Sequence, residues 1–179
     1  KKIANINQKI ESIIGVNFAL QLGFGFRSIK TQTRFFENQI KIILEAQPNI
    51  SKEDLYELAH EKVAVPEVSG HPTGGAVDVT IVNKKTGKPF DMGTPLLDVT
   101  SPEYKEKVKL TAVDLLNQEQ IENRLILQKL MMDEGFAPFW GEWWHFSFGD
   151  CEWATYYKEE NAIYSQKTQQ EILNYQLIK

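Results

Sequence analysis

The sequence predicts an α+β fold built on a small, mostly antiparallel sheet. Segments with helical spacing and segments with strand character follow one another without the regular strand–helix–strand order of a parallel sheet. The chain has 179 residues, of which 42% are hydrophobic. That length suits a single domain, and this composition is sufficient for a buried core.

Helices are expected where apolar residues recur at intervals of three and four. The segments concerned are residues 3–14, 29–46, 51–63 and 117–134, with a further short helix at 102–109. Strands are expected where apolar, β-branched and aromatic residues dominate, at residues 16–26, 76–82 and 142–148. Pro48 ends the second helix, and Gly135 ends the helix that starts at 117.

Two helices carry more detailed expectations. The inner side of the helix at 29–46 is expected to hold Phe35, Phe36, Ile40, Ile43 and Leu44. Ser51 is followed three residues later by Asp54, which resembles a capping box and starts the next helix, expected to reach about Val63. His60 in that helix has no partner motif, so we expect it at the surface.

Composition excludes several classes of protein. The net charge is −4 with both signs mixed along the chain, and no basic stripe indicates a nucleic-acid partner. No run of eighteen apolar residues predicts a membrane span. The single cysteine, Cys151, excludes an internal disulfide framework and a cysteine-rich zinc site. The oligomeric state does not follow from the sequence.

The stretch "SGHPTGGAVDVTIV" at 69–82 is the first candidate for a site. Strand alternation directs Asp78 away from the core face that holds Val79 and Ile81. His71 lies seven residues upstream, about 23 Å if the chain were extended. It approaches Asp78 only if the loop folds back, which its proline and glycines permit. Taken alone, the stretch fits a turn before an ordinary strand as well as it fits two metal ligands.

The second candidate is "EWWHFSF" at 142–148. Alternation is expected to place Trp144, Phe146 and Phe148 on the core face and Trp143, His145 and Ser147 on the other. His145 can then look into a site walled by Trp143. Glu142 precedes His145 by three residues and shares that site only if the backbone is irregular near Gly141. A solvated glutamate before a strand is the alternative.

Together, His71, Asp78 and His145 offer two nitrogens and one carboxylate. Three such protein ligands with an open fourth position are typical of a catalytic zinc site. Zinc lowers the pKa of water toward 7, and a nearby carboxylate can then take its proton and deliver it to a leaving amine. Glu142 is the candidate for that carboxylate.

At these residues the sequence resembles the zinc D-Ala-D-Ala metallopeptidases. "SGHPTGGAVDV" is similar to their Ser-x-His-x-x-Gly-x-Ala-x-Asp motif and "EWWH" to their Glu-x-x-His motif. The double tryptophan, "DMGT" at 91–94 and "GDCEWA" at 149–154 resemble the VanX-type dipeptidase branch in particular. The resemblance implies the zinc-site architecture shared with lysostaphin-type enzymes and the hedgehog domain, with one Zn²⁺ per chain.

The resemblance also implies individual roles. His71, Asp78 and His145 match the zinc ligands, and Glu142 matches the general base and acid. Arg27 matches an arginine that stabilises the oxyanion, which agrees with the physics of a guanidinium beside developing negative charge.

Other residues also match the family or are expected near the substrate. Gln32 matches a glutamine that recurs five residues after the arginine. Ser69 matches a serine that contacts substrate, and Trp143 and Trp144 are expected to shape the pocket.

The sequence departs from the family pattern at several places. Phe24 stands where an aspartate is usual, and Ser28 stands where a proline is usual. Leu97 occupies the position of an aspartate that holds the free amine of the substrate, and Asp98 follows as its possible replacement. Only 26 residues precede Arg27, so we expect the family's N-terminal strand to be absent and the site to be more open.

The resulting prediction is hydrolysis of the D-alanyl-D-alanine dipeptide to two D-alanines by a single zinc peptidase domain at 1–164, followed by a C-terminal extension at 165–179. Two alternatives stay open: a carboxypeptidase or endopeptidase acting on peptidoglycan stem peptides, and a catalytically silent zinc-bound binding module. A small D-amino-acid peptide is the expected partner. The bacterial cytoplasm is the favoured compartment, with the periplasm or export as alternatives.

Overall fold

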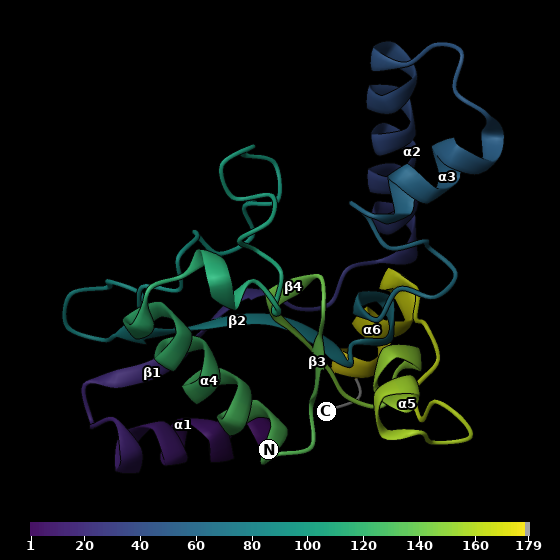
Figure 1. Cartoon of the computed structure of the whole chain (residues 1–179). Helices are drawn as coiled ribbons and strands as arrows, with labels where there is room; N and C mark the ends of the chain where they lie inside the picture. Colours follow the sequence, from purple (N-terminus) through teal and green to yellow (C-terminus); the bar gives the residue numbers. More distant parts are fainter. Residues whose placement is uncertain (178–179) are drawn as a thin grey trace.

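The computed structural model describes the backbone of residues 1–177 and the side chains of residues 1–174. Its centre is a four-stranded antiparallel sheet in the order β1-β2-β4-β3 (Figure 1). The strands are β1 (Phe18–Phe24), β2 (Ala76–Asn83), β3 (Ala137–Phe139) and β4 (Glu142–Ser147). The helices are α1 (Lys2–Ile13), α2 (Ile29–Ala46), α3 (Lys52–His60), α4 (Gln118–Met132), α5 (Cys151–Tyr157) and α6 (Gln169–Leu177). The α+β class predicted from the sequence is confirmed.

The main core lies where α1 and α4 pack beside each other along the sheet (Figure 1). Val79 and Ile81 of β2 face this core, as their alternation predicts. The helices contribute Ile6 and Ile10 from α1 and Leu127, Leu130 and Met131 from α4. Because these side chains are almost fully buried, they hold β2 and β4 firmly and so fix the position of the residues on the other face of the same strands.

Helices α2 and α3 form a hairpin that projects from the sheet (Figure 1). It has a small cluster of its own, made by Phe36, Ile43, Ala59 and Val65. Phe35 and Leu44, expected on the inner side of α2, are exposed. Since α2 packs mainly against α3, only a narrow stripe of its surface is covered, and these two residues fall outside it.

The helix starts follow from capping side chains. Ser51 Oγ accepts the backbone N–H of Asp54 at 3.1 Å, which confirms the predicted cap, although α3 ends at His60 rather than Val63. Asn117 caps α4 through a complete capping box with Gln120. Among the residues described, no helix is both long enough and apolar enough to cross a bilayer.

The segment 102–109 forms a series of turns, so the expected short helix is wrong. Its carbonyls are engaged elsewhere: the buried guanidinium of Arg124 donates to Lys107 O at 2.7 Å and to Lys109 O at 3.0 Å. The backbone N–H of Trp143 donates to Val108 O at 2.9 Å. These bonds tie the end of the segment to α4 and β4.

Candidate metal centre

Asp78 and His145 lie directly opposite each other in the antiparallel pair of β2 and β4. Opposite residues in such a pair point to the same face of the sheet. The result is a contact of 2.9 Å between Asp78 Oδ1 and His145 Nδ1, with both side chains buried. The sheet register therefore brings together two residues that are 67 positions apart in the chain.

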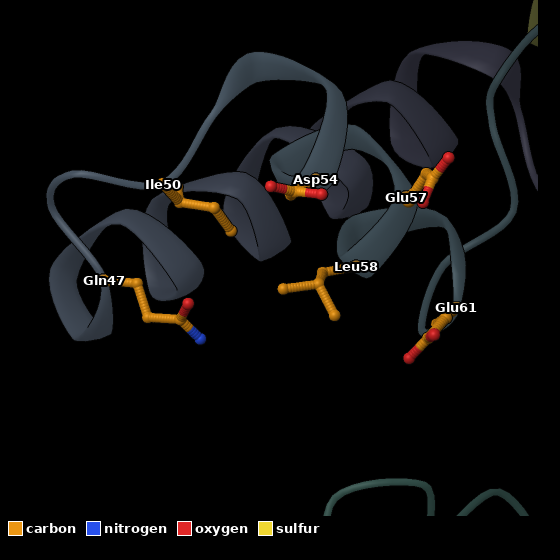
Figure 2. A pocket seen from close by; sticks show the side chains of 6 residues that line it. All are labelled: Gln47, Ile50, Asp54, Glu57, Leu58 and Glu61. Atoms are coloured by element: carbon orange, nitrogen blue, oxygen red, sulfur yellow. The ribbon is translucent and has the colours of Figure 1, made fainter.

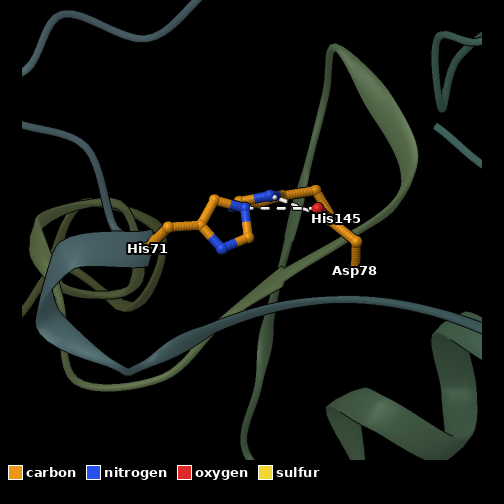
Figure 3. Close-up of side chains that lie close together, drawn as sticks. All are labelled: His71, Asp78 and His145. Carbon is orange, nitrogen blue, oxygen red and sulfur yellow. Dashed lines mark hydrogen bonds and ion pairs between the residues drawn. The ribbon is translucent and has the colours of Figure 1, made fainter. Parts of the chain in front are cut away.

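His71 reaches this pair because its loop turns sharply. A single turn of 3-10 helix, His71–Thr73, ends at Gly74, whose φ of 76° lies in the left-handed region that glycine adopts without strain. The turn directs His71 Nε2 to within 3.3 Å of Asp78 Oδ2. Figure 3 shows the three side chains converging. The loop thus folds back as the sequence predicted.

The donor atoms suit a divalent metal ion. One ligand atom from each of His71, Asp78 and His145 lies within 4.8 Å of the others. His71 Nδ1 donates to the Gly25 carbonyl oxygen at 2.8 Å, so Nε2, on the side of Asp78, is the nitrogen that can bind a metal ion. Two imidazole nitrogens and a carboxylate oxygen match the ligand types that zinc prefers, so the residues present fit this ion.

The carboxylate of Asp78 is strongly stabilised as an anion. Burial alone would raise its pKa, but hydrogen bonds from His145 and His71, together with their charges, lower the pKa to about 2. The same contacts with Asp78 help to raise the pKa of His145 against the effect of burial. A metal ion and protons would compete for the imidazole nitrogens that face Asp78.

Glu142 approaches the cluster from the first residue of β4. The pairing of β3 with β4 shifts register between Pro138 and Phe139, so the backbone is irregular there, as the sequence required. Burial raises the pKa of Glu142. The charge of His145 lowers this pKa, whereas the charge of Asp78 raises it. Trp144 holds the carboxylate by donating its indole N–H to Glu142 Oε2 at 3.0 Å.

Arg27 is held beside the loop that carries His71. Its Nη1 donates to Gln32 Oε1 at 2.8 Å, and its backbone N–H donates to the carbonyl oxygen of His71 at 3.3 Å. Gln32 is fully buried at the start of α2 and donates to Ala64 O at 2.7 Å. The guanidinium is therefore anchored on one side by an ordered amide.

The remaining side of Arg27 faces the cluster. Burial lowers its pKa, and Asp78 and Glu142 are the charges that counteract this effect. Its Nε is buried and has no hydrogen-bond partner within the described part of the chain. A buried donor of this kind is costly unless a ligand or water accepts from it.

A family model described as D-Ala-D-Ala dipeptidase, Peptidase M15, matches residues 8–166. The chain belongs to the Peptidase M15 D-Ala-D-Ala dipeptidase family. It is 32% identical over 120 residues to a D-alanyl-D-alanine dipeptidase of Synechocystis sp., covering 62% of this chain and 48% of that protein. It is 31% identical over 105 residues to one from Enterococcus faecalis, covering 58% of this chain and 46% of that protein. The chain spans about half the length of the curated relatives it matches.

Two solved structures are similar in part. A structure of VanYB in complex with D-alanine-D-alanine has a TM-score of 0.49 and 16% identity, covering 97% of this chain and 78% of that one. A mutant of the vancomycin resistance D,D-pentapeptidase VanY in complex with Zn(II) has a TM-score of 0.40 and 15% identity, covering 90% and 77%.

Phe24 and Phe139 form aromatic walls beside the two histidines of this family member. Phe24 replaces the family's usual aspartate and packs edge-on against His71, with ring centres 5.6 Å apart. Its ring also lies 4.4 Å from the guanidinium carbon of Arg27. Phe139 packs against His145 at 5.5 Å. The cluster is therefore bordered by apolar rings at both histidines.

Glu152 is a site residue that the sequence reasoning missed. Its Oε2 lies 3.1 Å from His145 Nε2 and accepts from Ser147 Oγ at 3.2 Å. Burial would raise the pKa of Glu152, but the hydrogen bond and charge of His145 and the hydrogen bond of Ser147 lower it. The available signal was its place in the first turn of a helix that Asp150 caps, only seven residues after His145.

The structure corrects the expected placement of Trp143. Its side chain is 2% exposed and belongs to the main core, where it donates to Thr94 Oγ1 at 2.8 Å. Alternation fails here because the register shift lies at the start of β4. Trp144 is equally buried and contacts Glu142 rather than an open pocket. The structure gives no support to substrate contact by either indole.

Two other expected substrate contacts are engaged within the protein. Both carboxylate oxygens of Asp98 are used in a turn, where they accept from Thr100 and Ser101. Ser69 is buried, and its carbonyl oxygen accepts from Gln166 at 3.1 Å. Substrate contact by Ser69 stays a prediction, whereas Asp98 would have to give up its turn to hold an amine.

The C-terminal segment contacts the loop that carries His71. Gln166 and Lys167, assigned to the extension by the sequence, bond to Pro66 O and Pro72 O respectively. The proposed boundary at residue 164 stays a prediction.

An open hollow on the α2–α3 hairpin is separate from this cluster (Figure 2). It is lined by Gln47, Ile50, Asp54, Glu57, Leu58 and Glu61. The lining of this hollow contains carboxylates but no histidine or cysteine, and it includes none of His71, Asp78 and His145. Among the described residues, the group that could hold a metal ion is therefore His71, Asp78 and His145.

Proposed function

We propose that this chain is a zinc-dependent peptidase that hydrolyses the D-alanyl-D-alanine dipeptide to two D-alanines. The observation that carries the proposal is the convergence of His71, Asp78 and His145, with Glu142 beside them, in a member of the D-Ala-D-Ala dipeptidase family. A silent binding module has no need of a carboxylate held next to its ligands.

Zinc would be held by His71 through Nε2, by His145 through Nδ1 and by the carboxylate of Asp78. When bound, zinc lowers the pKa of water and polarises a carbonyl group. The protein contributes a dry site with fixed ligands, because all three side chains are buried on paired strands and a braced loop.

Glu142 acts as the general base and then the general acid. It takes a proton from the attacking water and returns it to the nitrogen of the leaving D-alanine. Its raised pKa favours the first step, since a carboxylate with a higher pKa is a stronger base toward the attacking water. Trp144 limits the rotation of the carboxylate by donating to Oε2.

Arg27 stabilises the negative charge that develops on the carbonyl oxygen. The guanidinium is fixed by Gln32 and by backbone contact with His71, so no reorganisation is needed during the reaction. Its unpartnered Nε provides a buried donor for an oxygen of the substrate.

The test combines zinc analysis with D-alanine release from D-Ala-D-Ala. The wild type should bind one zinc per chain and release D-alanine, and Glu142→Ala should keep the zinc while losing hydrolysis. Glu160→Ala is the matched control, because Glu160 is exposed and its side chain makes no hydrogen bond or ion pair among the described residues. A wild type that binds zinc but hydrolyses no such peptide would support the silent module instead.

One observation favours a second candidate, a carboxypeptidase acting on stem peptides that end in D-alanine. A dipeptidase gains specificity from an acidic group that binds the free amine of its substrate. Leu97 occupies the family position for that group, and the carboxylate of Asp98 is occupied by Thr100 and Ser101. Supplying the dipeptide and a D-Ala-terminated pentapeptide separately decides between them: release from the pentapeptide alone would refute the dipeptidase.

A further inference from the structure

Glu152 lies behind His145, on the side of the ring away from Asp78. Asp78 contacts Nδ1 of His145, and Glu152 Oε2 lies 3.1 Å from Nε2. The two carboxylates therefore occupy opposite ring nitrogens. Glu152 comes from α5, a helix that contributes none of the three clustered ligands.

This contact determines which nitrogen of His145 can bind a metal. An ionised carboxylate only accepts hydrogen bonds, so Nε2 carries the hydrogen and donates it to Glu152. Because Nε2 faces Glu152 and Nδ1 faces the cluster, Nδ1 is the nitrogen that would offer a lone pair to a metal ion there. In His71 the two nitrogens have the reverse roles. The Gly25 carbonyl accepts from Nδ1, so Nε2 is the nitrogen available to a metal ion.

Glu152 is itself held in place. Ser147 Oγ donates to the same oxygen, Oε2, at 3.2 Å. Asp150 accepts the backbone N–H of Trp153 at 2.9 Å, which orders the first turn of α5 around Glu152. A carboxylate fixed on two sides can orient the imidazole and, by its charge, make the ring a stronger donor to a cation.

We infer that Glu152 is a positioning residue for His145 that raises the affinity of the site for zinc, with Ser147 as its support. The inference rests on the proposed zinc site but concerns a residue outside the ligand set and outside the reacting groups. Removing a carboxylate that accepts a hydrogen bond from a metal-binding histidine typically lowers the metal affinity by about 10–100-fold.

The experiment measures the zinc dissociation constant by competition with a chromophoric chelator. Glu152→Ala should weaken zinc binding about 10–100-fold. Glu152→Gln should weaken it less, because its amide oxygen can still accept from Nε2 while the charge is lost. Ser147→Ala should also cause a smaller loss. Glu160→Ala, on an exposed glutamate whose side chain makes no hydrogen bond or ion pair among the described residues, should bind zinc as the wild type does.

Thermal unfolding of each variant with and without zinc separates positioning from a general effect on folding. The inference expects the zinc-induced rise in melting temperature to shrink in Glu152→Ala. A lower melting temperature without zinc, combined with an unchanged dissociation constant, would overturn the inference. If Glu152→Ala does not fold, wild-type affinity in both Glu152→Gln and Ser147→Ala would overturn it equally. A wild type that fails to bind zinc would refute the proposed function and the inference together.

Discussion

The hydrogen bond from Trp144 to Glu142 predicts a change in the pH dependence of activity. Trp144→Phe keeps an aromatic ring in the core but removes the indole N–H that donates to Glu142 Oε2 at 3.0 Å. That bond stabilises the ionised carboxylate and so opposes the burial that raises the pKa of Glu142. Without it, the pKa should rise further.

The size of the shift follows from the strength of the bond. A hydrogen bond to a charged group contributes about 1.5–3 kcal/mol net, and one pKa unit corresponds to about 1.36 kcal/mol. Full loss would therefore raise the pKa by about 1–2 units. Because relaxation or water replaces part of the bond, we expect a rise of about 1 unit.

The assay is kcat/KM for D-alanine release between about pH 5 and 9, since its acid limb reports the ionisation of the base in the free enzyme. The base must be ionised to accept a proton, so the acid limb of Trp144→Phe should move to higher pH. Trp143→Phe is the matched control: it makes the same change in size but removes a bond to Thr94 instead. An acid limb that stays in place for Trp144→Phe, or moves equally in both variants, would refute this account of Glu142.

Three further predictions concern the site and the core. Arg27→Ala should lower kcat by about 10²–10³-fold while zinc content stays at the wild-type level, and a variant that loses its zinc would contradict an oxyanion role. Leu127→Ala should lower the free energy of unfolding in urea by about 2–5 kcal/mol, because Leu127 is fully buried. Leu125 is exposed on the same helix, so Leu125→Ala should change the free energy of unfolding by less than about 0.5 kcal/mol. In metal-free protein, the lowered pKa of Asp78 contributes stability that is present above about pH 4 and is lost as the pH falls toward 2. Urea unfolding should show a loss of about 2 kcal/mol over this range that is absent from Asp78→Asn.

Local sequence patterns predicted much of this structure correctly. The helix at 29–46 and the strand that begins at Ala76 appear at the expected positions, because each depends on spacing within its own segment. The segment 102–109 was mispredicted because its conformation depends on a distant contact. Its carbonyls accept from Arg124, a residue at least fifteen positions away, and no local pattern encodes that approach.

In the candidate site, too, some residues could be predicted from the sequence and others could not. The residue types of His71, Asp78 and His145, together with the family resemblance, pointed to a metal centre, and the structure brings the three together. Glu152 could not be inferred with equal force, since its contact with His145 depends on how α5 turns back after β4.

The sequence by itself determined which side chains are the candidate metal ligands and which face of β2 Asp78 occupies. Residue type and strand alternation are local properties, so Asp78 was separated from the core residues Val79 and Ile81 before any fold was known. Only the tertiary structure decided how Glu142 is held and that Trp143 lies in the core. The register shift at the start of β4 breaks the alternation on which the sequence argument depended, and a shift of one residue sends a side chain to the other face.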